Sequence, residues 1–256
     1  MLTNEAVFDE VSKSFDNHRK ADARVVSLVE SRLRSASRSV KVLDVGCGTG
    51  RYCYALAKRF PEAEFVGVDA SRGMIRLAES KCPRAWFING DIFEVGLPSK
   101  SFDAVLAFFV IHLLDWKRFL GLAKEVLAPG GTLFLITSDR TNRGGIFHDH
   151  MPLLKKRDAA RFPLMQELFS ELMRLDFSVE CTELPVPCVI KTKSDIRRLA
   201  SEAKDRAFSY FFLISDATLK NGLKEMEASL ARKIKTGPIS RDEITYFIVA
   251  RLKNPD

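Results

Sequence analysis

The stretch Val42-Leu43-Asp44-Val45-Gly46-Cys47-Gly48-Thr49-Gly50 decides the fold of this chain. Its first four residues are mostly apolar and β-branched, which is typical of a strand buried on both faces of a parallel sheet. Glycine then recurs at every second position, and glycine tolerates a positive φ and lets a ligand approach the bare backbone. Residues 51–60 read as a helix, so the stretch predicts a strand, a glycine turn and a helix N-terminus around a nucleotide-type pocket.

Three details of this region indicate which kind of nucleotide cofactor the pocket suits. A dinucleotide-binding G-x-G-x-x-G motif would need its third small residue at position 51, where the chain has Arg51. Asp44 stands two residues before the first glycine, where a carboxylate suits an ammonium group better than a pyrophosphate. Asp69 ends the apolar run of residues 65–69, and a carboxylate at the tip of a second strand can accept hydrogen bonds from both hydroxyls of a ribose.

This pattern resembles the class I S-adenosylmethionine-dependent methyltransferases, in particular those that act on small molecules. The Asn-Gly-Asp sequence at residues 89–91 is similar to the family's acidic position at the adenine. Residues 102–107 look like its fourth strand, and residues 127–132 like the turn into its fifth. The matches cover about residues 40–140 in the family's order and spacing. The resemblance implies S-adenosylmethionine as cofactor and S-adenosylhomocysteine as product.

Strand and helix alternate over residues 40–138, which predicts a parallel sheet with right-handed crossovers. With the resemblance, the chain is expected to be an α/β protein with a doubly wound, Rossmann-like, seven-stranded, mostly parallel sheet and an antiparallel last strand. Strands are expected near residues 40–45, 64–68, 85–88, 103–107, 132–137, 177–186 and 244–252.

A single methyltransferase domain is expected over residues 1–256, with additions around the cofactor-binding core of residues 40–138. Residues 1–39 are predicted to fold as helices over the cofactor. The segments 139–176 and 187–244 are predicted to be helical insertions after strands five and six that form a lid, and residues 245–252 the last strand. Within the first insertion, residues 139–150 are polar and contain glycine, so we predict a loop there.

The N-terminal segment is similar to the part of small-molecule methyltransferases that carries an aromatic-Asp-x-x-Arg stretch. Phe15 stands at the aromatic position, where tyrosine is usual, and Arg19 at the arginine position. The planar guanidinium of Arg19 could bind the carboxylate of the cofactor. An ordinary helical hairpin with a surface arginine is the alternative interpretation.

The residues expected at the cofactor come from the N-terminal segment and from the ends of the first four strands. They are Phe15, Arg19, Asp44, Gly46, Cys47, Gly48, Gly50, Asp69, Ala70, Met74, Asp91, Ile92 and Phe108. Met74 follows Ser71, a residue suited to begin a helix, and could cover one face of the adenine or simply pack in the core.

Methyl transfer from a sulfonium needs in-line alignment in a dry pocket, where proximity alone contributes up to about 7–11 kcal/mol. A general base helps only when the nucleophile arrives protonated. His112, just after the fourth strand, is the candidate catalytic base, and a histidine packed among apolar neighbours is the alternative. The sequence His148-Asp149-His150 could suggest a metal site, but neighbouring side chains diverge, so we predict a loop with solvated histidines and no metal.

The composition of the chain limits the classes of protein to which it can belong. Apolar residues make up 46% of the chain, with no run of eighteen or more and no charged-then-apolar leader, so we expect a cytoplasmic protein without a membrane span. The five cysteines are scattered, which suits reduced thiols. The net charge of +7 could suit an anionic partner, but no basic run is interleaved with aromatic residues, so nucleic acid is not expected. Nothing in the sequence indicates an oligomeric state.

The sequence predicts an enzyme that transfers a methyl group from S-adenosylmethionine to a small, partly apolar metabolite by in-line displacement. Residues 107–110 read Ala-Phe-Phe-Val where nucleic-acid base methylases usually have a proline-aromatic motif, which argues against base-amine methylation. Methylation of RNA or protein, and a catalytically silent cofactor-binding module, stay open as alternatives. A nucleotide-dependent oxidoreductase is disfavoured by Arg51 and Asp44.

Overall fold

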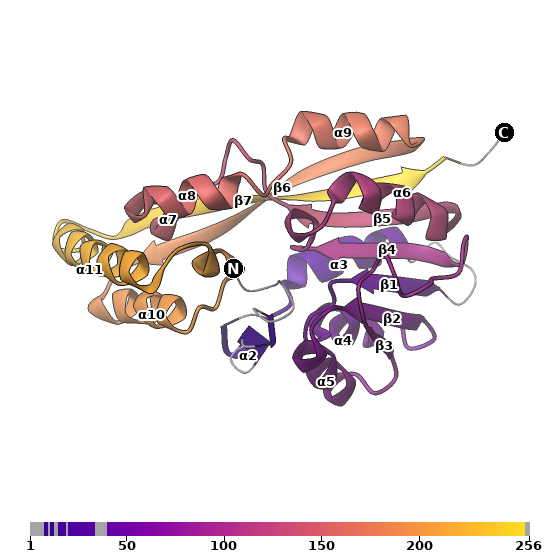
Figure 1. Cartoon of the computed structure of the whole chain (residues 1–256), viewed down its shortest axis with the longest axis horizontal. Helices are drawn as coiled ribbons and strands as arrows, with labels where there is room; N and C mark the ends of the chain where they lie inside the picture. The colour runs from indigo at the N-terminus through magenta and orange to yellow at the C-terminus, as the bar shows by residue number, and fades with distance from the viewer. Residues whose placement is uncertain (1–7, 10, 13–14, 19, 34–39, 254–256) are drawn as a thin grey trace. The chain divides into compact units, whose positions relative to one another are not determined.

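The computed structural model of the chain describes residues 8–9, 11–12, 15–18, 20–33 and 40–253 (Figure 1). These residues divide into two compact units. Unit 1 takes its residues from the ranges 1–137, 165–182 and 246–256, and unit 2 from 138–164 and 183–245. Within the described ranges, no helix is long and apolar enough to cross a membrane.

One sheet of seven strands has the order β3-β2-β1-β4-β5-β7-β6 (Figure 1). The first five strands pair in parallel, and β7 is antiparallel to β5. This confirms the predicted fold class. The strands are β1 (Lys41–Val45), β2 (Glu64–Asp69), β3 (Trp86–Asn89), β4 (Phe102–Phe108), β5 (Leu127–Thr137), β6 (Phe177–Ile190) and β7 (Ile239–Leu252).

β1 and β4 lie side by side at the centre of the sheet and are buried along most of their length. Asp44 is paired with Leu106 across these strands, so the carboxyl end of β1 lies beside that of β4. On the other side of β1, Val45 is paired with Val68 of β2. The carboxyl ends of β1, β2 and β4 therefore meet at one edge of the sheet, which is where open parallel sheets bind ligands.

Helices alternate with the strands of unit 1. They are α2 (Phe15–His18), α3 (Ala23–Leu33), α4 (Arg51–Ala57), α5 (Arg72–Lys81), the 3₁₀ helix η1 (Ile111–Leu113), α6 (Trp116–Val126) and α9 (Met165–Arg174). α5 begins as predicted, because the side chain of Ser71 accepts a hydrogen bond from the N–H of Met74 at 3.1 Å.

β6 and β7 are both longer than the predicted strands 177–186 and 244–252. Residues of the two strands meet at a constant register: the Ser178 hydroxyl donates to the Arg251 carbonyl, and the Thr245 hydroxyl to the Leu184 carbonyl. Both contacts fit one antiparallel register of β6 and β7. β6 continues through Pro185, which an edge strand tolerates because its outer N–H groups need no partner within the sheet.

α9 belongs to unit 1, whereas the prediction placed the whole of 139–176 in a lid insertion. Met165, Leu168 and Leu172 lie on one face of α9 and join the main apolar core, which also contains Leu133 and Ile248. The sequence predicts this amphipathic helix correctly, but helical spacing does not say which core its apolar face joins.

Unit 2 has its own apolar core. Its helices are α7 (Ile146–His150), α8 (Pro152–Ala159), α10 (Lys193–Lys204), the 3₁₀ helix η2 (Ser209–Leu213) and α11 (Asp216–Lys233). Apolar residues of α7, α10, η2 and α11 pack together in this core. The prediction of a loop over 139–150 is wrong for its last part, because Ile146 and Phe147 are buried there and α7 forms around them.

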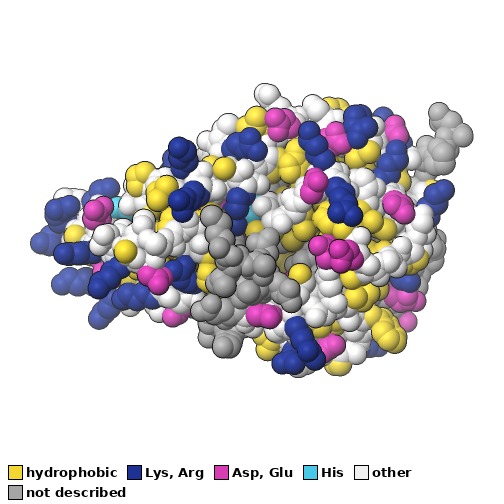
Figure 2. Space-filling model, in the orientation of Figure 1, with side chains coloured by type: hydrophobic (Ala, Val, Ile, Leu, Met, Phe, Trp, Pro, Cys, Tyr) yellow, Lys and Arg dark blue, Asp and Glu magenta, His cyan; other side chains and the backbone are white. Residues whose placement is uncertain are grey.

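Most of the chain's net positive charge lies in unit 2, which carries 18 Lys and Arg against 12 Asp and Glu. On the face shown in Figure 2, Lys and Arg side chains gather over the end of unit 2 that carries α10 and α11. No such excess is found in unit 1, so charge as well as packing distinguishes the two units.

Replacement of Leu168 by alanine tests whether α9 is part of the unit 1 core. Leu168 is fully buried, so Leu168→Ala should lower the free energy of unfolding by about 2–5 kcal/mol. Met173 on the same helix is 59% exposed, so Met173→Ala should change the free energy of unfolding by less than about 0.5 kcal/mol. Urea unfolding followed by circular dichroism measures both, and equal effects of the two substitutions would contradict this packing.

Candidate functional site

The turn after β1 has the conformation that its glycines predict. Gly46, Gly48 and Gly50 have φ values of +62°, +55° and +68°, in the left-handed region where side chains are strained. A Cβ on Gly46 would also lie 2.4 Å from Cγ2 of Val110, so the backbone is packed closely there. The three glycines are therefore required by the path of the chain.

Asp69, at the end of β2, holds this turn in place. One of its carboxylate oxygens accepts the N–H of Gly48 at 2.9 Å, and the other accepts the N–H of Ser71, also at 2.9 Å. Burial raises the pKa of Asp69, and the N–H donors of Ser71 and Gly48 oppose this shift. The carboxylate thus joins the glycine turn to the start of α5.

Asp44 is a buried carboxyl group at the end of β1, only 3% exposed. Burial raises its pKa to about 7, although the thiol of Cys53 donates to its Oδ2 at 3.3 Å and Arg51 is attracted to it. A carboxyl group in this state binds a proton or a neighbouring cation at neutral pH. The position therefore suits the ammonium group that the sequence predicts there.

The described part of the N-terminal segment is attached to this turn. Phe15 is buried, and a Cβ on Gly48 would lie 4.0 Å from its ring. Asp16 accepts hydrogen bonds from the hydroxyl of Thr49 and the ammonium of Lys81, both at 2.6 Å. Arg19, the predicted carboxylate ligand, lies outside the described residues.

A second N-terminal carboxylate binds the start of α5. Oδ1 of Asp9 accepts the hydroxyl of Ser71 at 2.5 Å and the N–H of Gly73 at 2.8 Å. These hydrogen bonds lower the pKa of Asp9. Sequence reasoning missed Asp9, Asp16 and Lys81, because the partners of each lie more than 30 residues away in the chain.

The other predicted cofactor residues follow the same sheet edge but differ in exposure. Ala70 and Asp91 are exposed, and Asp91 accepts the N–H of Phe93 at 2.9 Å. Cys47, Met74, Ile92 and Phe108 are buried. Met74 is in the interior of α5, and Ile92 is in the main core.

His112 lies in η1, directly after β4, and is half-buried. The chain leaves the sheet at Phe109, whose φ of +58° is unusual for a residue other than glycine and whose N–H donates to the Ile136 carbonyl. His112 thus follows the carboxyl end of β4, which is paired with β1. The structure brings it to the sheet edge that also carries Asp44 and the glycine turn.

The prediction of solvated histidines in a loop is wrong. His148 is 1% exposed, and its Nε2 lies 3.1 Å from a carboxylate oxygen of Asp158. His150 is half-buried, and its Nδ1 lies 2.8 Å from the Ile146 carbonyl within α7. Among the residues that the structure describes, no group of three or more His, Cys, Asp or Glu side chains has the arrangement of a metal site.

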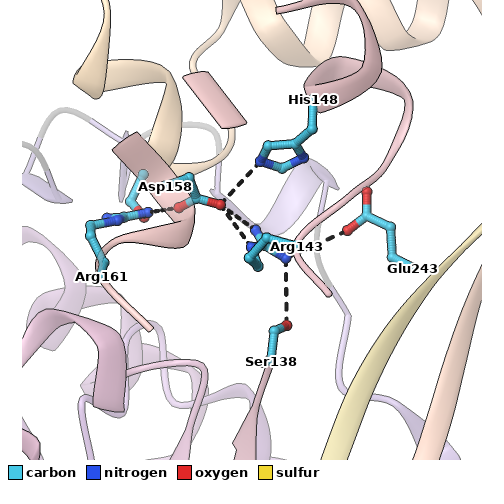
Figure 3. A network of polar contacts seen from close by, with 7 residues as sticks. Ser138, Arg143, His148, Asp158, Arg161 and Glu243 are labelled. Atoms are coloured by element: carbon cyan, nitrogen blue, oxygen red, sulfur yellow. Dashed lines mark hydrogen bonds and ion pairs between the residues drawn. The ribbon is translucent and has the colours of Figure 1, made fainter. Parts of the chain in front are cut away.

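His148 belongs to a buried charge network in unit 2 (Figure 3). Asp158 is fully buried and accepts hydrogen bonds from Nε and Nη2 of Arg143, at 2.8 and 2.6 Å, and from Arg161. Burial would raise the pKa of Asp158, but His148, Arg143 and Arg161 together hold it well below its usual range. Arg143 also lies 3.9 Å from a carboxylate oxygen of Glu243, so the two arginines face two carboxylates. The network that connects α7 and α8 is therefore a structural feature.

Residues 42–131 match the model of a family described as a methyltransferase domain. Over this range the chain is similar to methyltransferase domains. The matched range contains the glycine turn, Asp69 and His112, so the candidate site lies within the methyltransferase domain.

The chain is also similar to curated relatives and to solved structures. The demethylmenaquinone methyltransferase of Thermus thermophilus is 36% identical over 101 residues, which cover 38% of this chain and 46% of the relative. A protein of Anabaena variabilis, assigned as a methyltransferase of an antibiotic biosynthesis pathway, is 25% identical in structure-based alignment. Its TM-score is 0.72, over 91% of this chain and 99% of that one.

The [4+2]-cyclase SpnF has the same fold, with a TM-score of 0.59 and 19% identity over 91% of this chain and 82% of its own. The chain spans about half the length of the first curated relatives that it matches. The similarity to these curated relatives therefore covers only part of each protein.

The raised pKa of Asp44 predicts that the stability of unit 1 depends on pH. Its pKa of about 7 exceeds the ordinary value of 3.8, so the folded chain binds more protons than the unfolded chain between these two values. The free energy of unfolding should therefore fall as the pH rises from about 4 to about 7, by up to about 1.4 kcal/mol per pH unit, and level off above that. Urea unfolding of the wild type and Asp44→Asn at pH 5 and pH 8 measures this difference. An identical pH dependence of the two proteins would contradict the burial of an ionisable Asp44.

Proposed function

We propose that the chain transfers a methyl group from S-adenosylmethionine to a small, partly apolar metabolite. The observation that carries this proposal is the hydrogen bond between the Asp69 carboxylate and the N–H of Gly48, inside the range that matches the methyltransferase domain. It joins the acidic tip of β2 to the glycine turn after β1, and these are the two features that a nucleoside with an amino-acid tail requires.

The side chains of the site fit this cofactor. Each carboxylate oxygen of Asp69 accepts one backbone N–H and keeps a second lone pair, so the two oxygens can still accept the two ribose hydroxyls. The positive φ of Gly48 leaves bare backbone where the cofactor would approach. Asp44 would hold the ammonium group, because a neighbouring cation favours its charged form.

When bound, the cofactor supplies an electrophilic methyl group on a sulfonium. The role of the protein is to bind the adenosine, to exclude water and to accept a proton when the acceptor carries one. We propose His112 as the group that accepts it, because it follows β4 at the same sheet edge as Asp44. The residues that precede His112, such as Phe108 and Val110, are apolar, which supports an acceptor with an apolar part.

The acceptor is proposed to be small and partly apolar. A relative of the matched domain acts on demethylmenaquinone, as its name says, which supports an apolar acceptor. Methylation of RNA or protein stays the alternative. That residues 139–176 and 187–244 form a lid over the acceptor stays a prediction, as does a cytoplasmic location.

The fold by itself does not require methyl transfer, since SpnF has this fold and is described as a cyclase. A catalytically silent cofactor-binding module is therefore a real alternative to an enzyme. Cofactor binding and methyl transfer need separate measurements.

Replacement of Asp69 tests the binding site. Asp69→Ala should weaken binding of S-adenosylhomocysteine by at least about tenfold, because charge-assisted hydrogen bonds to the ribose contribute about 1.5–3 kcal/mol each. Isothermal titration calorimetry measures this, and NAD should give no heat. Glu64→Ala, at the exposed opposite end of β2, is the matched control and should bind like the wild type. Equal affinity of Asp69→Ala and the wild type would remove Asp69 from the site.

Replacement of His112 tests the proposed proton acceptor. His112→Gln should lower the rate of label transfer from [methyl-³H]S-adenosylmethionine to an accepting alcohol, phenol, amine or thiol by about 10²–10⁴-fold. Binding of S-adenosylhomocysteine should stay unchanged, because the substitution leaves the glycine turn intact. An unchanged transfer rate would exclude His112 as a base, and a wild-type chain that binds the cofactor but labels no acceptor would favour the silent module.

A further inference from the structure

Two segments of unit 2 that are far apart in the sequence meet at one end of the β6–β7 pair (Figure 1). In the register of these strands, Ile190 at the end of β6 lies opposite Ile239 at the start of β7. α10 follows β6, α11 precedes β7, and the two helices pack against each other. The segments 184–194 and 228–241 therefore form one end of unit 2, which we call the basic end.

The basic end carries positive charge that no acidic residue within it balances. Neither segment contains Asp or Glu, whereas together they contain six Lys and Arg, which are Lys191, Lys193, Arg232, Lys233, Lys235 and Arg241. Arg241 is paired with Asp149 at 2.9 Å. The other five cations are exposed and form no ion pair with any residue that the structure describes.

The lysines at the start of α10 are not placed to stabilise their own helix. Lys193 is the first residue of α10 and Lys191 precedes it, at the positive end of the helix dipole, where a cation is unfavourable. Asp195 caps this helix and accepts the N–H of Lys191 at 2.9 Å. Arg232 and Lys233 lie in the last turn of α11, where the dipole favours a cation. A partner outside the chain therefore explains Lys191 and Lys193 better than helix stability does.

Exposed apolar side chains accompany this charge. Val186 is 42% exposed and Val189 is 40% exposed, both near the end of the edge strand β6. Pro185 and Pro187 alternate with them, and proline has no N–H to offer to a further strand. The prolines therefore disfavour the addition of a strand as the way in which the valines are covered.

Aliphatic side chains beside a cluster of lysines and arginines match the surface of an anionic lipid bilayer. Such a surface presents negative head groups and, directly beneath them, an apolar layer. A single-stranded nucleic acid would instead need aromatic side chains on which its bases stack. Neither segment of the basic end contains Phe, Tyr or Trp.

We propose that the basic end of unit 2 docks on the surface of an anionic lipid bilayer. The five exposed cations contact the lipid head groups, and Val189 lies at the boundary with the acyl chains. A chain docked in this way meets apolar molecules that are dissolved in the bilayer, which suits a partly apolar methyl acceptor. The docking itself does not require methyl transfer, so it is measured without cofactor or acceptor.

Sedimentation with lipid vesicles measures this docking. The wild-type chain should bind vesicles of equimolar phosphatidylcholine and phosphatidylglycerol, and should not bind vesicles of phosphatidylcholine alone. Binding should fall when the salt concentration rises from about 0.1 M to about 1 M, because the Debye length shortens from about 10 Å to about 3 Å.

A double substitution tests the cations. Lys233→Gln with Lys235→Gln should lower the affinity for the anionic vesicles by about 25-fold, since each cation near such a surface contributes about fivefold. Arg84→Gln with Lys117→Gln removes the same charge from exposed positions of unit 1 and is the matched control. The control should bind the vesicles within about twofold of the wild type.

The substitution Val189→Ser separates a lipid surface from other anions. It should weaken binding to the anionic vesicles by about threefold to tenfold, because less apolar surface is buried. Binding to heparin, a polyanion without an apolar layer, should stay unchanged.

A wild-type chain that does not bind the anionic vesicles, or that binds neutral vesicles equally well, would overturn this proposal. Equal losses for the two double variants would overturn the role of the basic end. Binding to heparin but not to the vesicles would also contradict the proposal and favour another anionic macromolecule as partner. The proposed function is tested by cofactor binding and methyl transfer, so its failure is distinguishable from each of these results.

Discussion

The bridge that Asp69 makes between the N–H groups of Gly48 and Ser71 is the interaction on which the candidate site depends. It fixes the turn after β1 relative to the start of α5, so that two segments separated by more than 20 residues form one surface. The positive φ values of the turn bring the Gly48 N–H to this carboxylate. An alanine at Gly46 would collide with Val110, which shows how little freedom the backbone has beside this bridge.

Buried charged side chains have different partners in the two units. In unit 2, the carboxylate of Asp158 contacts Arg143 and Arg161, and Glu243 also lies near Arg143, so two arginines face two carboxylates. In unit 1, Asp44 is buried and Arg51 half-buried, and neither has a hydrogen-bonded partner of opposite charge among the described residues. Compensated charge indicates a structural role, whereas uncompensated charge at a turn costs stability that an oppositely charged ligand would restore. The contrast gives a physical reason to place the ligand in unit 1.

The sequence predicted the parallel strands well, because near-continuous apolar runs such as residues 42–45 and 102–108 leave few alternatives to a buried strand. It predicted Asp69 and the glycine turn for a similar reason, since their roles follow from local backbone chemistry. Features that depend on distant partners were missed. Helix α7 and the burial of His148 require Asp158, and the side on which α9 packs requires the main core. The same holds for Arg51, whose contact with Phe15 joins residues 36 positions apart.

The central claim is that the glycine turn and Asp69 form the binding site of S-adenosylmethionine. A crystal structure of the chain with bound S-adenosylhomocysteine tests this most directly. The account predicts both ribose hydroxyls within hydrogen-bonding distance of the Asp69 carboxylate, and the ammonium group of the ligand near Asp44. Adenosine bound away from the carboxyl ends of β1 and β2, with the Asp69 carboxylate free of ligand contacts, would contradict it.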